Sequence, residues 1–238
     1  MLDYLAGADV EVVDVPFGPE LEAVKYALAE KLKAEGLKPY VIAGPRSTAL
    51  AAVAFAWCIA EIHEQQEAMG IDADWSYAGS AGGTQAGLIL GAKALGMKLK
   101  PVGIAPIHWA DRIERVRIAT NEAAKLLNLA PRITDDEVDN TDAYIGEAYG
   151  MVTPECVEAL KLVAQTEGIF LDPVYTGKAF AGLIDHIRQG KIASDETVIF
   201  LHTGGTPALF AYNDEISLGS GYSSKIVEAS KRVMPINS

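Results

Sequence analysis

The residues best suited to chemistry form one glycine-rich stretch, Gly79-Ser80-Ala81-Gly82-Gly83-Thr84-Gln85-Ala86-Gly87. It separates a predicted strand at residues 74–78 from a predicted helix at residues 85–95. Glycines let the backbone turn tightly and approach a ligand closely. The first amides of a helix have no partner within the helix and carry partial positive charge. With the hydroxyls of Ser80 and Thr84 added, the stretch predicts a phosphate-binding turn.

Two familiar phosphate motifs do not fit this stretch. It lacks the GK[ST] ending of a P-loop, and its glycines at positions 79, 82, 83 and 87 do not make GxGxxG. The competing interpretation is a tight strand-to-helix turn that binds nothing. We favour a ligand, because one glycine is enough for such a turn and this stretch has four in nine residues.

A second stretch, His202-Thr203-Gly204-Gly205-Thr206-Pro207-Ala208-Leu209-Phe210, repeats the arrangement. It follows an apolar run at residues 198–201 and precedes another predicted helix. In doubly wound folds, ligands bind at the edge of the sheet where the parallel strands end. Two glycine turns at that edge predict that a phosphorylated small molecule binds there. The residues alone do not identify this molecule.

Strands and helices alternate along the chain, and the glycines fall in the turns from strand to helix. Residues 134–142 are polar and are predicted to form a loop. The alternation predicts an α/β fold with an open, twisted, mostly parallel sheet and helices on both faces. The apolar patterns predict strands at residues 10–15, 38–42, 74–78, 98–106 and 197–202, and helices at residues 19–35, 48–69, 85–95 and 110–127. Two more helices are predicted, one that starts at residue 153 and one that ends at residue 190.

Composition narrows the class of partner. The net charge is −12, whereas nucleic acids and anionic membranes attract clustered Lys and Arg, so a small molecule is the expected ligand. No apolar run approaches the roughly 20 residues that cross a bilayer, and the first residues lack the pattern of a signal peptide. Cys58 and Cys156 lie in apolar helical patterns, without a CxxC pair. We expect buried thiols in a reducing cytoplasm and no metal site.

The other ionisable candidates are given structural roles or none. We expect His202 to be a hydrogen-bonded core histidine of its strand. Lys178 lies at the start of a predicted helix and is interpreted as structural. His63, His108 and His186 lie in no motif and are assigned no role.

Three stretches together resemble the D-cysteine desulfhydrase and ACC deaminase family of tryptophan-synthase-β-like pyridoxal-phosphate (PLP) enzymes. They are the two glycine turns and Asp172-Pro173-Val174-Tyr175-Thr176-Gly177-Lys178. The motifs are specific in combination, and the resemblance is strongest to D-cysteine desulfhydrase, with L-cysteate sulfo-lyase as a neighbour. It runs from about Gly7 to about Tyr212. It implies that residues 1–42 are the C-terminal remnant of a smaller α/β domain and that residues 43–238 form an incomplete large PLP-binding domain.

The resemblance implies PLP as the cofactor and assigns roles to matching positions. The amides from Ala81 to Thr84 would hold the phosphate, and Thr203 would hydrogen-bond the pyridine nitrogen. Tyr149 and Tyr175 would face the substrate carboxylate or amino group, with Tyr175 a candidate for proton transfer; ordinary half-buried tyrosines are the alternative. The full cofactor-binding set is Gly79, Ser80, Ala81, Gly82, Gly83, Thr84, Thr203 and Gly204.

Two threonines help to separate branches of the family. ACC deaminases, as the resemblance implies, carry a glutamate at the position of Thr176 and an apolar residue at that of Thr203. A neutral hydroxyl does not favour protonation of the ring nitrogen as a carboxylate would, so the ring withdraws electrons more weakly. Eliminating a good leaving group from Cβ needs less electron withdrawal than opening a cyclopropane. The pair therefore favours a β-eliminating desulfhydrase.

Members of this family bind PLP covalently through a lysine in an Asn-Lys motif near their N-terminus, followed by a serine-rich loop. Neither occurs in these 238 residues, and the resemblance begins in mid-domain near Tyr4. We therefore expect a truncated enzyme that, by itself, binds PLP weakly at best and shows no lyase turnover. Exposed sheet edges would also make it poorly soluble.

The reaction implied for the parent enzyme is elimination from D-cysteine, giving pyruvate, ammonia and hydrogen sulfide. L-Cysteate is a second candidate substrate. A cytoplasmic homodimer is implied for the full-length parent. ACC deamination and a non-catalytic phosphate- or small-molecule-binding module remain the alternatives.

Overall fold

The computed structural model describes residues 2–15, 18–42, 44–130 and 132–217. The chain separates into two compact units, residues 1–48 and residues 49–238. The domain boundary predicted between residues 42 and 43 stays a prediction.

The first unit contains the helix predicted at residues 19–35. This helix, α2 (Pro19–Ala34), has a proline in its first turn, where no backbone hydrogen bond is lost. Gly36 follows its end at φ +84°, a conformation that glycine adopts easily. A short helix, α1 (Leu2–Leu5), precedes it.

The strands predicted at residues 10–15 and 38–42 are not strands in the structure. Among the described residues neither segment pairs with a sheet, and Val12 is 92% exposed. A run of β-branched residues becomes a strand only when a neighbouring strand takes up its backbone hydrogen bonds. The sequence pattern was therefore insufficient here.

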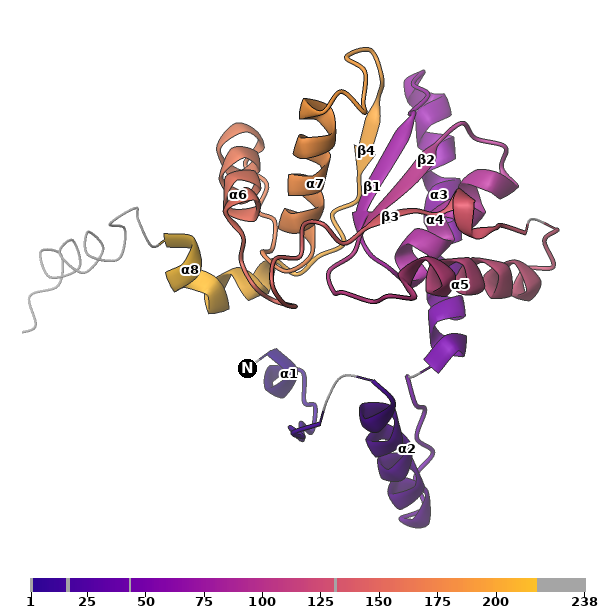
Figure 1. Ribbon diagram of the computed structural model, residues 1–238. Helices are drawn as coiled ribbons and strands as arrows, with labels where there is room; N and C mark the ends of the chain where they lie inside the picture. The colour runs from indigo at the N-terminus through magenta and orange to yellow at the C-terminus, as the bar shows by residue number, and fades with distance from the viewer. Residues whose placement is uncertain (1, 16–17, 43, 131, 218–238) are drawn as a thin grey trace, which may run out of the picture. The chain divides into compact units, whose positions relative to one another are not determined.

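The second unit contains a sheet of four parallel strands (Figure 1). Their order is β3-β2-β1-β4, and every neighbouring pair is parallel. The strands predicted at residues 74–78, 98–106 and 197–202 are confirmed. The bounds are β1 (Trp75–Gly79), β2 (Lys100–Ile104), β3 (Asp139–Thr141) and β4 (Val198–Phe200).

The stretch predicted to be a loop, residues 134–142, contains β3, so that prediction is wrong. The strand reads Asp139-Asn140-Thr141 and has no apolar alternation. It is a strand because it pairs with β2, Asn140 lying opposite Gly103. Tertiary pairing here overrides a polar local pattern.

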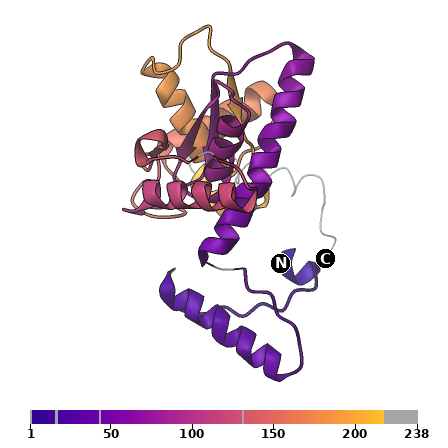
Figure 2. The same ribbon diagram turned by 90° about the vertical axis from the view of Figure 1, so that its right-hand side faces the viewer.

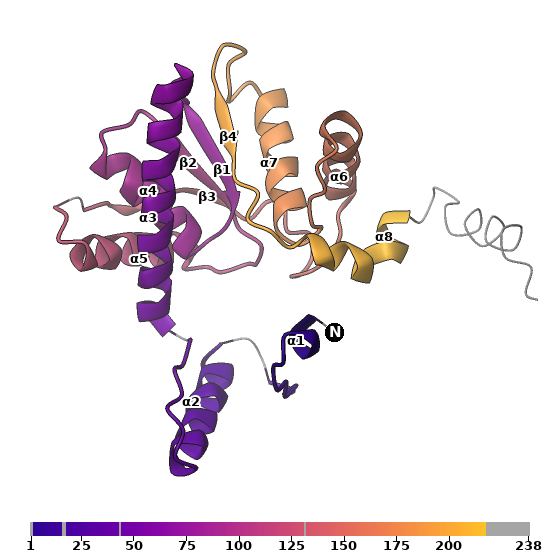
Figure 3. The same cartoon turned by 180° about the vertical axis from the view of Figure 1, so that it is seen from behind.

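Helices cover both faces of the sheet, as predicted (Figures 1 and 3). α3, α4 and α5 lie on one side, and α6 and α7 on the other; α3 and α5 are in front of the sheet in Figure 2. The predicted helices are confirmed, although α3 begins earlier than expected. The bounds are α3 (Gly44–Met69), α4 (Gly83–Ala94), α5 (Arg112–Leu126), α6 (Pro154–Glu167) and α7 (Thr176–Arg188).

The remaining turns are short. The helix predicted after the second glycine turn is a 3-10 helix, η2 (Thr206–Tyr212), followed by α8 (Asn213–Ser217). Another 3-10 turn, η1 (Asp135–Glu137), precedes β3. None of the helices in the described part of the chain has both the length and the apolar character needed to span a membrane.

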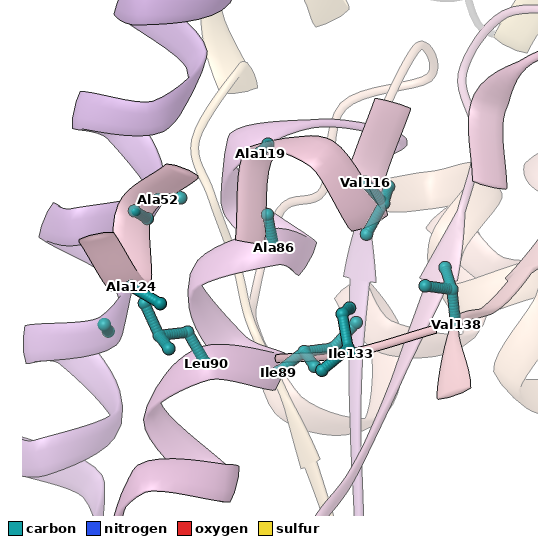
Figure 4. Close-up of a cluster of buried hydrophobic side chains, with 11 residues drawn as sticks. Ala52, Ala86, Ile89, Leu90, Val116, Ala119, Ala124, Ile133 and Val138 are labelled. Carbon is teal, nitrogen blue, oxygen red and sulfur yellow. The ribbon is translucent and has the colours of Figure 1, made fainter. Parts of the chain in front are cut away.

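Small residues let α3, α4 and α5 pack closely in one buried cluster (Figure 4), while a second cluster lies between β1, β2 and α7. A Cβ added to Gly87 would lie 2.4 Å from the carbonyl oxygen of Ala52. Gly87, the last glycine of the predicted phosphate stretch, therefore serves helix packing. The first cluster consists of Ala52, Ala56, Ala86, Ile89, Leu90, Val116, Ala119, Ala123, Ala124, Ile133 and Val138.

Candidate functional site

The two glycine turns lie at the same edge of the sheet, as predicted. β1 and β4 are parallel neighbours, with Tyr77 opposite Phe200. The amide of Leu201 donates to the carbonyl of Tyr77 at 2.9 Å, so the pairing continues past the end of β4. The turns that begin at Gly79 and His202 therefore leave neighbouring strands at their carboxyl ends, where ligands bind in such sheets.

Ser80 shapes the first turn from inside. Its hydroxyl oxygen accepts the amides of Gly82 at 3.1 Å and of Gln85 at 3.3 Å. Its own amide donates to the carbonyl of Ile104 at 2.9 Å, and its side chain is buried. Ser80 is also a predicted cofactor-binding residue; its oxygen accepts two amides of the turn, its hydroxyl hydrogen is not used in these two bonds, and the cofactor-binding role stays a prediction.

Three amides of the first turn remain available. Among the described residues, the structure contains no acceptor for the amides of Ala81, Gly83 and Thr84. Gly83 and Thr84 begin α4, where the helix contributes partial positive charge. A Cβ added to Gly82 would meet no atom within 4 Å, so the turn faces open space. This is the arrangement that binds a phosphate group.

A buried amide network, which the sequence analysis missed, anchors the same turn. Asn140 donates through Nδ2 to the carbonyl of Ser80 and to Oε1 of Gln85, both at 2.7 Å. Gln85 is fully buried and donates through Nε2 to the carbonyl of Asp139 at 2.7 Å. A Cβ on Gly103 would lie 2.2 Å from Gln85 Oε1, so this position needs glycine. No motif could have revealed this network, because β3 itself was read as a loop.

The third motif forms a carboxylate cap at the start of α7. Asp172 is fully buried, and its Oδ2 accepts the amides of Val174 at 2.8 Å and Tyr175 at 2.9 Å. Its Oδ1 accepts the amide of Thr176 at 2.8 Å and the hydroxyl of Thr176 at 2.7 Å. Negative charge is favourable at a helix N-terminus. The cap therefore holds the backbone that carries Tyr175.

Glycines bring this cap against both turns. A Cβ on Gly79 would lie 2.8 Å from the carbonyl oxygen of Tyr175. A Cβ on Gly205 would lie 2.7 Å from Cγ of Asp172, and Gly205 also has φ +89°. The three stretches that carried the resemblance thus meet at one edge of the sheet.

The two predicted substrate-facing tyrosines are in direct contact. The hydroxyls of Tyr149 and Tyr175 are 2.7 Å apart, and the rings meet edge-on. Burial, followed by the hydrogen bond with Tyr149, raises the pKa of Tyr175 above the usual value of a phenol, which is already protonated at neutral pH. A third tyrosine, Tyr212, lies beside this pair: its hydroxyl would be 3.0 Å from a Cβ on Gly150. The sequence analysis gave Tyr212 no role.

The second turn is more open than the first. Thr203 and His202 are exposed. His202 accepts the amide of Gly204 at Nδ1 over 3.2 Å, and its Nε2 lies 2.9 Å from the carbonyl of Phe170. The prediction that His202 is a core histidine is therefore wrong, because the side chain is exposed. The predicted hydrogen bonding of His202 is present. The chain leaves the sheet at this residue, which exposes the ring.

The remaining predictions concern single residues. Thr176 is fully buried, and its hydroxyl donates to Asp172 and accepts the Asp172 amide at 2.8 Å. Cys156 is buried as predicted, which raises the pKa of its thiol to about 12, whereas Cys58 is only partly buried. Across the described ranges, no group of three or more His, Cys, Asp or Glu side chains could hold a metal ion.

The edge fits a phosphorylated, planar cofactor such as PLP. The amides of Ala81, Gly83 and Thr84 would receive the phosphate. Thr203, on the neighbouring strand end, would present a hydroxyl to the ring, and the tyrosine pair lies at the same edge. A buried carboxylate, Asp172, is fully engaged with backbone donors and does not compete for the phosphate site.

The chain is similar to several known proteins. The D-cysteine desulfhydrase of Serratia proteamaculans (strain 568) is 35% identical over 217 residues, covering 89% of this chain and 63% of that protein. A putative 1-aminocyclopropane-1-carboxylate deaminase of Pyrococcus horikoshii is 37% identical over 219 residues, covering 91% and 64%. A crystal structure of an ACC deaminase homologue matches with a TM-score of 0.79 at 35% identity, covering 90% of this chain and 64% of that one.

The chain thus spans less than two thirds of the length of these relatives. The family model described as pyridoxal-phosphate dependent enzyme matches residues 1–204. The predicted resemblance, the fold class and the cofactor of the family are confirmed. The chain belongs to the family of pyridoxal-phosphate-dependent enzymes.

Proposed function

We propose that this chain provides the phosphate-binding and substrate-facing half of a PLP-dependent carbon–sulfur lyase that acts on D-cysteine, with L-cysteate as a second candidate. The observation that carries the proposal is the set of three available amides, Ala81, Gly83 and Thr84, one strand away from Thr203. Relatives named D-cysteine desulfhydrase support the substrate class. The products would be pyruvate, ammonia and hydrogen sulfide.

PLP, when bound, supplies an electron-withdrawing ring that stabilises negative charge at the substrate Cα. The residues of this chain would bind and orient. The start of α4 would hold the phosphate, and Thr203 would accept or donate at the ring nitrogen without a charge of its own. A neutral partner suits the elimination of a good leaving group.

The tyrosine pair would bind the substrate carboxylate. One hydroxyl of Tyr149 and Tyr175 donates to the other across 2.7 Å, which leaves one phenolic proton free to donate. A carboxylate is a strong acceptor for that proton. Tyr175 would also hold a proton near the leaving group, since a phenol is protonated at neutral pH and burial raises its pKa further.

ACC deamination is the alternative enzyme reaction. The Pyrococcus horikoshii relative and the matching crystal structure, an ACC deaminase homologue, support it. Thr176 and Thr203 weigh against it, and the two reactions have different products. Release of 2-oxobutyrate from ACC would favour deamination, and release of pyruvate from D-cysteine would favour the lyase.

These 238 residues contain no Asn-Lys motif that could supply the covalent lysine. We therefore expect weak PLP binding and no turnover from these residues alone. Pyruvate release from D-cysteine by this chain alone would contradict that expectation. A module that binds a phosphorylated ligand without catalysis remains a second candidate. We also propose that the enzyme is a cytoplasmic homodimer.

Calorimetric titration tests the phosphate site directly. PLP should bind at least about tenfold more tightly than pyridoxal, which lacks the phosphate, since a phosphate at a helix N-terminus makes charge-assisted hydrogen bonds. Gly83→Pro should remove most of this difference, because it deletes one amide at a helix position that tolerates proline. Thr84→Val keeps the amide and should have a smaller effect. Equal affinity for PLP and pyridoxal would overturn the proposal.

A further inference from the structure

The loop that carries Tyr149 is held by two side chains from other parts of the fold. This segment between β3 and α6, residues 142–153, is called the tyrosine loop. Lys178 Nζ donates to the carbonyl of Ile145 at 2.6 Å. Nε2 of His108 lies 3.2 Å from the carbonyl of Gly146. Two nitrogen donors thus bind consecutive carbonyls of one loop.

Lys178 is an unusual residue for its position. It lies in the first turn of α7, where the helix already carries partial positive charge, and it is 1% exposed. Burial lowers the pKa of its ammonium group, because the charged form is poorly solvated there. A leucine or methionine would avoid both penalties. Its recorded acceptor among the described residues is Ile145, so the tether to this carbonyl is the feature that explains the lysine.

His108 presents both ring nitrogens to acceptors. Nδ1 lies 3.1 Å from Oδ2 of Asp142, and Nε2 faces Gly146. Asp142 also pairs with Arg112 at 3.2 Å. The hydrogen bonds to Asp142 and then to Gly146 raise the pKa of His108. Only the imidazolium can donate from both nitrogens.

The two tethered carbonyls, those of Ile145 and Gly146, lie just before Tyr149 in the chain, and Lys178 lies one helical turn after Tyr175. Lys178 lies in the first turn of α7, three residues after the N-cap residue Tyr175, so it links the start of this helix to the loop that carries Tyr149. Ile145 is fully buried and packs with Ala81 of the phosphate turn. Loss of a tether would let Tyr149 leave Tyr175 without disturbing the sheet.

We propose that Lys178 and His108 are positioning residues, which hold the tyrosine loop so that the hydroxyl of Tyr149 meets that of Tyr175. Their value to a substrate rests on the proposed function. Their role in holding the loop does not rest on the proposed function, because it concerns only contacts within this chain.

Limited proteolysis measures the tether without any cofactor. Tyr149 is 53% exposed even in the tethered loop, but a protease needs the backbone to open locally, so chymotrypsin should cleave after Tyr149 faster when the loop is released; cleavage after the exposed Tyr40 provides an internal reference. Lys178→Met keeps the length and apolar stem and should raise the ratio of Tyr149 to Tyr40 cleavage by about tenfold or more. Lys161→Met, on the exposed side of α6, is the matched control and should leave the ratio unchanged.

The pH profile separates a histidine tether from general destabilisation. As pH rises through the raised pKa of His108, the ring loses one proton, and the charged Asp142 retains the remaining Nδ1–H. The bond to Gly146 is then lost, so the cleavage ratio should rise with pH. His108→Ala should show the high ratio at every pH, whereas His108→Gln, which keeps an amide donor, should restore a low and pH-independent ratio. His63→Ala is the surface control.

Each outcome decides one question. An unchanged cleavage ratio in both Lys178→Met and His108→Ala would overturn the inference. If Lys178→Met fails to fold, as judged by thermal unfolding, the exposed His108 variants carry the test alone. Equal affinity for PLP and pyridoxal, with cleavage ratios that change as expected, would reject the proposed function and leave the positioning roles standing.

Discussion

The two glycine turns share a sequence pattern and an edge of the sheet, yet they are built differently. The turn after β1 rests on buried Gln85 and Asn140 and opens a regular helix, α4. The turn after β4 is exposed, uses Gly204 and Gly205 at φ +106° and +89°, and leads into the 3-10 helix η2.

This difference suits the two turns to different roles in binding a ligand. Only the first aligns unpaired amides with the axis of an α-helix, which is what attracts a phosphate. The second turn offers a side chain, Thr203. Its backbone packs against the Asp172 cap, because Gly205 approaches the carboxyl group of Asp172 closely. A strand followed by Gly-Gly therefore predicts the location of a ligand, and the buried polar residues beneath it decide the role.

The largest effect should come from the support of the second turn. Asp172→Ala would leave the amides of Val174, Tyr175 and Thr176 without their acceptor in a buried site. We expect the free energy of unfolding to fall by about 3–5 kcal/mol, measured by urea denaturation. The exposed Asp195→Ala should change it by less than about 0.5 kcal/mol. A loss as small as that of the control would show that the cap does not support the turn.

A smaller effect is expected beneath the first turn. Gln85→Leu preserves volume but removes the bonds to Asp139 and Asn140. The free energy of unfolding should fall by about 2–3 kcal/mol, because buried partners lose their hydrogen bonds. Gln65→Leu, at an exposed position of α3, is the control. If both variants unfold at the same urea concentration as the unsubstituted protein, the anchoring role of Gln85 is rejected.

The smallest effect should come from the exposed part of the second turn. His202→Leu removes hydrogen bonds to Gly204 and Phe170 from a solvent-accessible ring. Water can replace these bonds, so the free energy of unfolding should fall by less than about 1 kcal/mol. A loss that equals the loss for Gln85→Leu would remove the contrast between the two turns.

The pattern of apolar and polar residues predicted a strand or helix correctly where one face of that element is buried, because burial produces the pattern. The strands around Tyr77 and Phe200 and the helices of the second unit are confirmed. The same reasoning failed for residues 10–15, which lack a strand partner among the described residues, and for β3, which is polar. Pairing between distant segments is invisible to a window of neighbouring residues.

The site shows the same division. The sequence singled out the first glycine turn, the third motif, and Tyr149 and Tyr175 as substrate-facing residues, and these roles stay predictions. The contact between the two tyrosines was found only in the structure. In the first glycine stretch, Ser80 shapes the turn and Gly87 packs a helix, and the predicted contact of Ser80 with the cofactor stays a prediction. Asn140, His108 and Tyr212 were missed, because each matters only through residues far away in the chain.

The sequence by itself determined the alternation of strands and helices, the two glycine turns and the family, because these depend on spacing along the chain. Only the tertiary structure decided which polar groups are consumed by the fold and which stay available. Asp172, Ser80 and Gln85 satisfy backbone donors and acceptors, whereas the amides of Gly83 and Thr84 remain open. The physical reason is that a hydrogen bond depends on the position of both partners, and distant partners meet only when the chain is folded.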